Sequence, residues 1–115
     1  MKTNTNQSIS KKERKFKWKE AKKVIKNGKK SAYQNILIAY LPSKTWKFRI
    51  NLTKNIKPAV RRNRIKRIIR EVYRLSKPQF THPFKVVFTV IEFEENIDFH
   101  EFKSKYIELL QNAQN

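Results

Sequence analysis

Apolar residues recur along the chain with two different periods, and the change of period divides it into helices and strands. From Lys11 to Asn27 the spacing is helical, Ser10 stands where an N-terminal cap is expected, and Gly28 stands where a glycine commonly ends a helix. We therefore predict one helix over this range. Its apolar residues are Phe16, Trp18, Ala21, Val24 and Ile25.

Two strands are predicted next. Residues 36–41 are apolar on both faces, and after Pro42 the apolar residues of 46–52 alternate with polar ones. Because the two runs follow each other closely, we expect them to form a hairpin. The second strand is one-sided, and its polar face carries Lys47, Arg49, Asn51 and Thr53.

The second half of the chain contains two helices and one strand. Pro58 suits a first helical position, and a basic helix continues from it to about Leu75. Residues 84–93, rich in Val and Phe, are typical of a third strand. Asp98 followed by Glu101 resembles a capping box that opens a last helix. The apolar stripe of this helix is Phe99, Phe102, Tyr106, Leu109 and Leu110.

This order of elements predicts an α+β fold with a small mixed sheet and one strand-helix-strand crossover in the middle. At 115 residues the chain has the length of one domain, which we place at 10–115 after a flexible start at 1–9. It has no cysteine and no apolar run long enough for a membrane span or an export signal. We expect a cytoplasmic protein without membrane insertion.

Charge points to a polyanionic partner. The net charge is +19, and residues 1–90 hold 26 Lys or Arg against three acids, whereas residues 91–115 hold two Lys against six acids. Solubility alone requires a net charge of magnitude only about 2 to 8 in a small domain. Acidic membrane surfaces are a rival partner. Binding to them requires an amphipathic helix whose bulky apolar residues are not already needed to fill the protein core. Nucleic acid is the favoured interpretation.

The central helix carries the most specific signal. On a helical wheel its isoleucines share one face with Val72 and Leu75, and its cations gather on the opposite face with Asn63. Like charges three or four residues apart each cost about 0.2 to 0.5 kcal/mol, so this face is strained without a ligand. A solvated basic face is the alternative interpretation. The abundance of Arg, whose planar fork grips phosphate and stacks on bases, favours nucleic acid.

The same segment resembles a known family, the protein component of bacterial ribonuclease P. That family's signature has Ala-Val, one variable residue, Arg-Asn-Arg, then Lys-Arg and Arg-Glu at these spacings. Two departures are Lys57-Pro58 in place of the usual Gly-Asn, and Asn55 in place of a second Lys. The matching stretch is Lys54-Asn55-Ile56-Lys57-Pro58-Ala59-Val60-Arg61-Arg62-Asn63-Arg64-Ile65-Lys66-Arg67-Ile68-Ile69-Arg70-Glu71.

The resemblance implies both a fold and a function. The central helix would make a left-handed crossover between parallel strands, as in the second domain of a small-subunit ribosomal protein, against the usual right-handed rule. The protein would bind a large catalytic RNA, and together they would remove the 5′ leader from precursor tRNA. The RNA subunit would hold the catalytic metal ions, Mg²⁺. No small-molecule substrate is implied.

The resemblance also implies two contact surfaces. One would face the catalytic RNA and comprises Lys54, Arg61, Arg62, Asn63, Arg64, Lys66, Arg67, Arg70 and Arg74. The other, a cleft between the first helix and the sheet, would hold the single-stranded leader. Ala21, Ile25 and Ala39 occupy positions that are commonly aromatic in the family, and for each nearby aromatic, core packing remains an open alternative to base stacking. The leader candidates are Phe16, Lys17, Trp18, Lys22, Tyr33, Tyr40, Lys47 and Arg49.

The acids do not suggest independent nuclease chemistry. Metal-dependent cleavage needs clustered carboxylates, yet the first 90 residues hold only Glu13, Glu20 and Glu71. His82 and His100 form no evident acid-base pair, so we assign no catalytic residue and no metal ligand to the protein. A ribosomal-type RNA-binding protein is the main competing hypothesis, because it would share the charge and the Arg-rich helix. A DNA-binding module is a weaker one, since no helix-turn-helix or zinc pattern is present.

Overall fold

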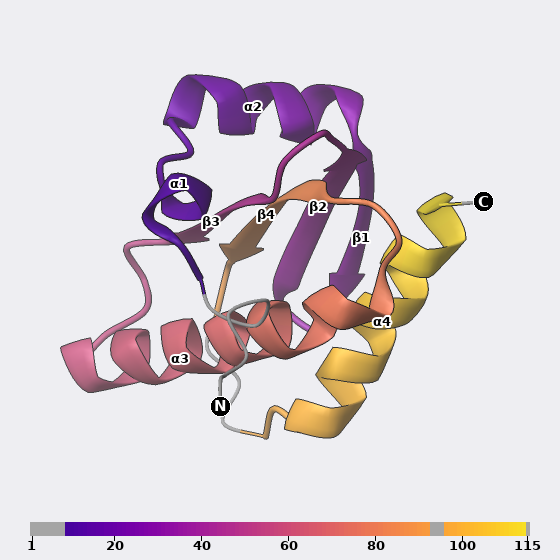
Figure 1. The fold of residues 1–115 in the computed structure, drawn as a ribbon. Helices are drawn as coiled ribbons and strands as arrows, with labels where there is room; N and C mark the ends of the chain where they lie inside the picture. Colours follow the sequence, from indigo (N-terminus) through magenta and orange to yellow (C-terminus); the bar gives the residue numbers. More distant parts are fainter. Residues whose placement is uncertain (1–8, 93–95, 115) are drawn as a thin grey trace.

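The computed structural model describes residues 9–92 and 96–114 (Figure 1). The predicted flexible start at 1–9 lies almost entirely outside the described residues. Four helices, one short 3₁₀ turn and a four-stranded sheet follow one another, which confirms the α+β class. The elements are α1 (Lys11–Arg14), α2 (Trp18–Asn27), β1 (Lys29–Tyr33), β2 (Ile36–Pro42), β3 (Lys47–Leu52), α3 (Ala59–Ser76), η2 (Lys77–Gln79), β4 (Phe84–Val90) and α4 (Phe99–Gln114).

The sheet has the strand order β1-β2-β4-β3. The β4 strand pairs antiparallel with β2 and parallel with β3, so α3 forms the predicted crossover between β3 and β4. The predicted hairpin of β2 with β3 is wrong, because β4 lies between them. The reason is burial: every residue of β4 is buried or half-buried, which suits the centre, whereas Phe48 is the one fully buried residue of β3, which suits an edge.

The hairpin partner of β2 is β1, which the sequence pattern did not reveal. Lys29 and Lys30 are exposed there, and Tyr33 is the only buried residue of the strand. A tight turn joins the pair, with Gln34 in the left-handed region at a φ of 51°. An edge strand needs little apolar surface, which explains why hydrophobic periodicity missed it.

The first helix is also corrected. Two helices, α1 and α2, replace the single one predicted over 11–27, and Ser10 caps α1 through a capping box with Glu13. Lys15 and Lys17 leave helical geometry, and Phe16 between them is only 2% exposed because its ring enters the core beside α2. The break lets Phe16 be buried at a position that a continuous helix would aim elsewhere.

The remaining boundaries agree within a few residues. Pro58, predicted as the first helical residue, is instead the N-cap of α3, so the helix begins one position later, at Ala59. The β4 strand ends at Val90, before residue 93, which is not described. Asp98 accepts a hydrogen bond from the Glu101 N–H at 3.0 Å, as a cap should. The Glu101 carboxylate instead accepts from the Tyr33 hydroxyl at 2.7 Å, which ties α4 to β1.

Gly28 ends α2, as predicted, and the structure supplies the reason for glycine. Its backbone is extended, so no left-handed conformation is involved. A Cβ there would lie 2.5 Å from the carbonyl oxygen of Tyr40 and 2.7 Å from that of Val24. Only glycine allows α2 to approach β2 this closely.

Helices cover the two faces of the sheet unequally (Figure 1). On one face α3 and α4 pack over a large core that includes Ile69, Tyr73, Phe88, Phe102 and Tyr106. On the other face α2 lies over a small cluster, whose buried members are Phe16, Ala21, Val24, Ala39 and Val87. We call these the helix-pair face and the α2 face. The α4 stripe predicted from sequence is confirmed, since Phe102, Tyr106 and Leu110 are fully buried.

Candidate nucleic-acid interface

The outer side of α3 is a bare polar and cationic face. The predicted apolar side is buried through Ile65, Ile69 and Val72, so the helix presents its opposite side to solvent. Within the described part of the chain, these outer side chains make no hydrogen bond or ion pair with another residue. They are Asn63, Arg64, Lys66, Arg67 and Arg70, of which only Lys66 is half-buried.

Two arginines of the predicted set have internal partners. Arg62 donates from Nη1 to the carbonyl oxygens of Thr53 at 3.1 Å and Ile56 at 3.2 Å, so it braces the loop that leads into α3. Arg74 forms a two-pronged pair with Glu71, with both distances 2.8 Å. The Arg74 guanidinium lowers the pKa of Glu71, against a smaller opposing effect of burial. Lys54 and Arg61 are exposed at the start of this surface.

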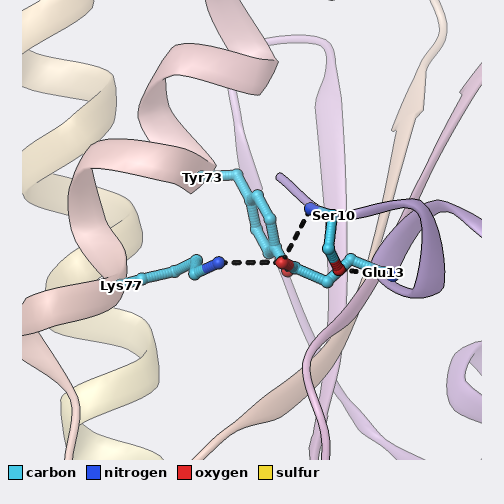
Figure 2. Close-up of polar contacts among 4 residues, drawn as sticks. All are labelled: Ser10, Glu13, Tyr73 and Lys77. Carbon is cyan, nitrogen blue, oxygen red and sulfur yellow. Dashed lines mark hydrogen bonds and ion pairs between the residues drawn. The ribbon is translucent and has the colours of Figure 1, made fainter. Parts of the chain in front are cut away.

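A buried carboxylate anchors α1 to the other end of α3 (Figure 2). Glu13 accepts hydrogen bonds from the Tyr73 hydroxyl and from Lys77 Nζ at 2.9 and 3.0 Å, and its Oε1 also accepts from the Ser10 N–H. Burial acts to raise the pKa of Glu13, but these hydrogen bonds outweigh it and the pKa is lowered below its ordinary value. Glu13 therefore stays ionised and holds α1 in place.

A second cationic surface lies where α2 meets the edge strand β3. Trp18 is 46% exposed, and the Arg49 guanidinium lies 5.4 Å from its ring centroid in a cation-π contact. Arg49 also donates to the carbonyl of Phe16 at 3.0 Å and to Asn51 Oδ1 at 2.9 Å. Lys47, two residues along the strand, donates to the carbonyl of Lys15 at 3.2 Å. These bonds hold two cations and one exposed indole in a fixed arrangement.

The α2 face is hollowed on both sides of Ile25. One hollow of about 150 Å³ opens between α2 and the sheet, with Leu37 and Thr89 in its wall. The other, about 500 Å³, follows the outer side of α2 between Trp18 and Ile25 and is bordered by Lys19, Lys22, Lys23 and Lys26. Leu37 is 44% exposed although it lies within β2, which pairs with a strand on each side. The sequence pattern did not identify Leu37 or Thr89, because an apolar run does not show which face stays uncovered.

Three of the four predicted leader-binding aromatics lie in the core. Phe16, Tyr33 and Tyr40 are 2%, 8% and 5% exposed, so in this structure their rings pack in the core and are not presented for base stacking. Tyr33 stacks on Phe102, and burial together with its bond to Glu101 raises its pKa to about 12. Trp18 alone among the four offers an exposed ring. The predicted cations Lys17 and Lys22 are exposed, whereas Lys47 and Arg49 are half-buried.

Residues that could bind a metal ion do not cluster within the part of the chain that the structure describes. Among residues 9–92 and 96–114, no three His, Asp or Glu side chains come together in a group that could hold a metal ion. Glu13 and Glu71 are each engaged by a cation, as described above. None of the described helices is long and apolar enough to cross a membrane.

Comparison with known proteins identifies the family. The family model described as Ribonuclease P matches residues 9–114. The ribonuclease P protein component of Dictyoglomus turgidum is 34% identical over 107 residues, which are 90% of each chain, and that of Caldanaerobacter subterraneus is 33% identical over 84% of this chain and 85% of its own.

Solved structures show the same fold. A Staphylococcus aureus RNase P protein mutant, described as defective in mRNA degradation activity, superposes with a TM-score of 0.72 at 20% identity, covering 90% of each chain. The RNase P protein from Thermotoga maritima superposes with a TM-score of 0.63 at 20% identity, covering 81% of this chain and 90% of that one. From the family match and the relatives that share nine tenths of their length with it, the chain belongs to the ribonuclease P protein family, the protein subunits of the ribonucleoprotein enzyme that processes the 5′ ends of tRNA.

Proposed function

We propose that the outer side of α3 binds the catalytic RNA subunit of ribonuclease P in the cytoplasm. The observation that carries this proposal is the set of unpaired polar and cationic side chains on one helical face, from Asn63 to Arg70. Uncompensated cations this close together repel one another, and phosphates would relieve that repulsion. Arg62 supports the surface from behind by bracing the 53–56 loop.

The precursor tRNA leader is proposed to lie on the α2 face. Trp18 and Arg49 form a stacked platform there, and Lys17, Lys22 and Lys47 surround it. An exposed indole flanked by cations suits single-stranded RNA, because stacking tolerates any base while the cations bind the backbone. The apolar hollow between Ile25 and Leu37 continues this surface over the sheet. The burial of Phe16, Tyr33 and Tyr40 restricts stacking to Trp18.

Magnesium belongs, in this proposal, to the RNA subunit. The described carboxylates do not fit a magnesium site, since no three acidic or histidine side chains among the described residues come together, Glu13 is buried among its donors and Glu71 is paired with Arg74. Mg²⁺ is usually held by one or two carboxylates together with phosphates, and here the phosphates would have to come from RNA. The protein's own contribution is then to bind and position the two RNAs.

Cleavage of a 5′-extended precursor tRNA by a bacterial ribonuclease P RNA at low magnesium tests the proposal. We expect the wild-type protein to restore cleavage and a triple variant, Arg64→Ala, Lys66→Ala and Arg67→Ala, to lose most of that effect. Arg62 is left intact because its loss would also disturb the loop before α3. The matched control removes three cations away from both surfaces, Lys29→Ala, Lys103→Ala and Lys105→Ala.

The two variants separate specific contact from bulk charge. Both lose three positive charges, so equal loss of cleavage would show that only net charge matters and would contradict the role of α3. Tight RNA binding by the wild type without any stimulation of cleavage would instead favour a purely structural RNA-binding role. Preference for leader-bearing precursor over mature tRNA, measured with the same proteins, tests the α2 face separately.

A further inference from the structure

A third recess adjoins the second cationic surface, with which it shares Lys47. It has a volume of about 660 Å³ and opens between α1, the 43–46 loop and the start of β3. Trp46 forms part of its wall, and the lysines around it are Lys12, Lys15, Lys44 and Lys47. We call it the Trp46 pocket. Its size falls in the range of about 300 to 1,000 Å³ that small-molecule and cofactor sites occupy.

The aromatic wall of the pocket is held rigidly from the core side. The Trp46 indole meets the Tyr73 ring edge-on, with 5.6 Å between the ring centroids. Its centroid lies 5.9 Å from that of Phe80 and 6.0 Å from that of Phe84. The same side chain is half-buried, so part of it still faces the recess. A planar group entering the pocket would thus meet an indole already held by three ring contacts, which lowers the entropy cost of binding.

Charge in the pocket is unbalanced. Four lysines line it, and the acid among its lining residues is Glu13. Figure 2 shows that the Glu13 carboxylate is turned toward Tyr73 and Lys77, which already satisfy it. Lys12, Lys15 and Lys44 are exposed, and within the described residues their side chains pair with no acid. The pocket therefore attracts an anion.

We propose that the Trp46 pocket binds one nucleotide, with its base against the indole and its phosphate on Lys12 and Lys44. An aromatic wall combined with unpaired lysines is the chemistry that recognises a base and a phosphate together. A free mononucleotide and one residue of an RNA strand share this chemistry. The strand is the favoured source, because Lys47 lies two residues from Arg49 on β3 and so links the pocket to the Trp18 platform.

Tryptophan fluorescence tests this site without any cleavage assay. The chain has two tryptophans, so a Trp18→Phe protein reports on Trp46 alone. The probes are a single-stranded RNA of four uridines, adenosine monophosphate and inorganic phosphate. We expect the tetranucleotide to quench Trp46 saturably. Lys12→Ala with Lys44→Ala should weaken binding about fivefold and reduce the salt dependence of log K by about 0.7 for each lost phosphate contact.

The control pair, Lys29→Ala with Lys103→Ala, removes the same charge from β1 and α4. The inference is wrong if the two pairs weaken quenching equally, if the tetranucleotide does not quench Trp46, or if inorganic phosphate displaces the tetranucleotide. Saturable quenching by both nucleotide probes, lost in the Lys12 and Lys44 pair, supports a site open to free nucleotides. Quenching by the tetranucleotide alone supports the RNA strand. Neither result depends on the cleavage test, so the proposed function can stand or fall separately.

Discussion

The two faces of the sheet are built from the same strands but differ in what covers them. The helix-pair face buries large rings, among them Tyr73, Phe88 and Tyr106, beneath two long helices. The α2 face buries a smaller cluster under one ten-residue helix and leaves Leu37 and Trp18 exposed. Stability is concentrated on the first face, and the thin cover of the second leaves room for a ligand. Loops and half-covered faces commonly carry function for this reason.

The largest effect should come from truncating the core of the helix-pair face. Phe88 is fully buried and its ring packs against Phe102 and Tyr106. Phe88→Ala should lower the free energy of unfolding by about 3 to 5 kcal/mol. Leu37→Ala, on the same sheet but exposed on the α2 face, is the matched control and should cost less than about 1 kcal/mol. Urea denaturation measures both, and equal losses would show that the faces do not differ.

Helical periodicity predicted much of the helix-pair face. Regular apolar spacing located α3 and α4 and distinguished the buried side of α3 from its cationic side. The sheet order was not predictable in this way, because the insertion of β4 between β2 and β3 depends on a crossover of more than thirty residues. Neighbouring strands in sequence usually pair, and here that rule led to the wrong partner for β2.

The candidate site was only partly predictable for a related reason. Residue type does not distinguish a buried ring from an exposed one, so Phe16 and Trp18 looked equivalent although only Trp18 is exposed. The bond between Glu13 and Tyr73 joins residues 60 positions apart, beyond any local pattern. The signature on α3 was recognisable because its spacing lies within one helix.

The next largest effect concerns the carboxylate that fastens α1 to the helix-pair face. The Glu13 and Lys77 side chains are 9% and 10% exposed. Glu13→Gln keeps the shape but removes the charge that accepts from Lys77, so the free energy of unfolding at neutral pH should fall by about 1.5 to 3 kcal/mol. Thermal or urea unfolding measures the loss. Glu71→Gln, which breaks an exposed pair on α3, should cost less than about 1 kcal/mol and serves as the control.

The same contact should give a pH-dependent stability. Folding lowers the pKa of Glu13 below its ordinary value of 4.5. The contribution of the ionised carboxylate to the free energy of unfolding is therefore complete above pH 4.5 and is lost as the pH falls through the lower pKa of the folded state. The difference in unfolding free energy between wild type and Glu13→Gln should therefore be constant from pH 7 to pH 5 and shrink at more acidic pH. A difference that grows on acidification would contradict the lowered pKa.

A change on the α2 face should affect binding more than stability. Trp18→Ala removes the exposed ring over which Arg49 stacks. If the leader stacks there, affinity for leader-bearing precursor tRNA should fall by about 1 to 3 kcal/mol, while affinity for mature tRNA is unchanged. The free energy of unfolding should change by less than about 1 kcal/mol, since the residue is largely outside the core. Fluorescence anisotropy measures the affinity of wild type and variant for each RNA. An equal loss of affinity for precursor and mature tRNA would exclude a leader contact.

The smallest effect comes from the ion pair that bridges α2 and β4 across the α2 face. Glu20 and Lys85 are 3.8 Å apart and are 40% and 30% exposed. An exposed pair of this kind contributes about 0 to 1 kcal/mol, so Glu20→Gln should hardly change the unfolding free energy. It also removes an acid beside the proposed leader surface and releases Lys85, so RNA affinity measured by anisotropy should rise about twofold at low salt and converge with wild type as salt increases. A stability loss near that of Glu13→Gln would mean that charge, rather than the small apolar cluster, holds α2 on the sheet, and the two faces would then differ in kind as well as in extent.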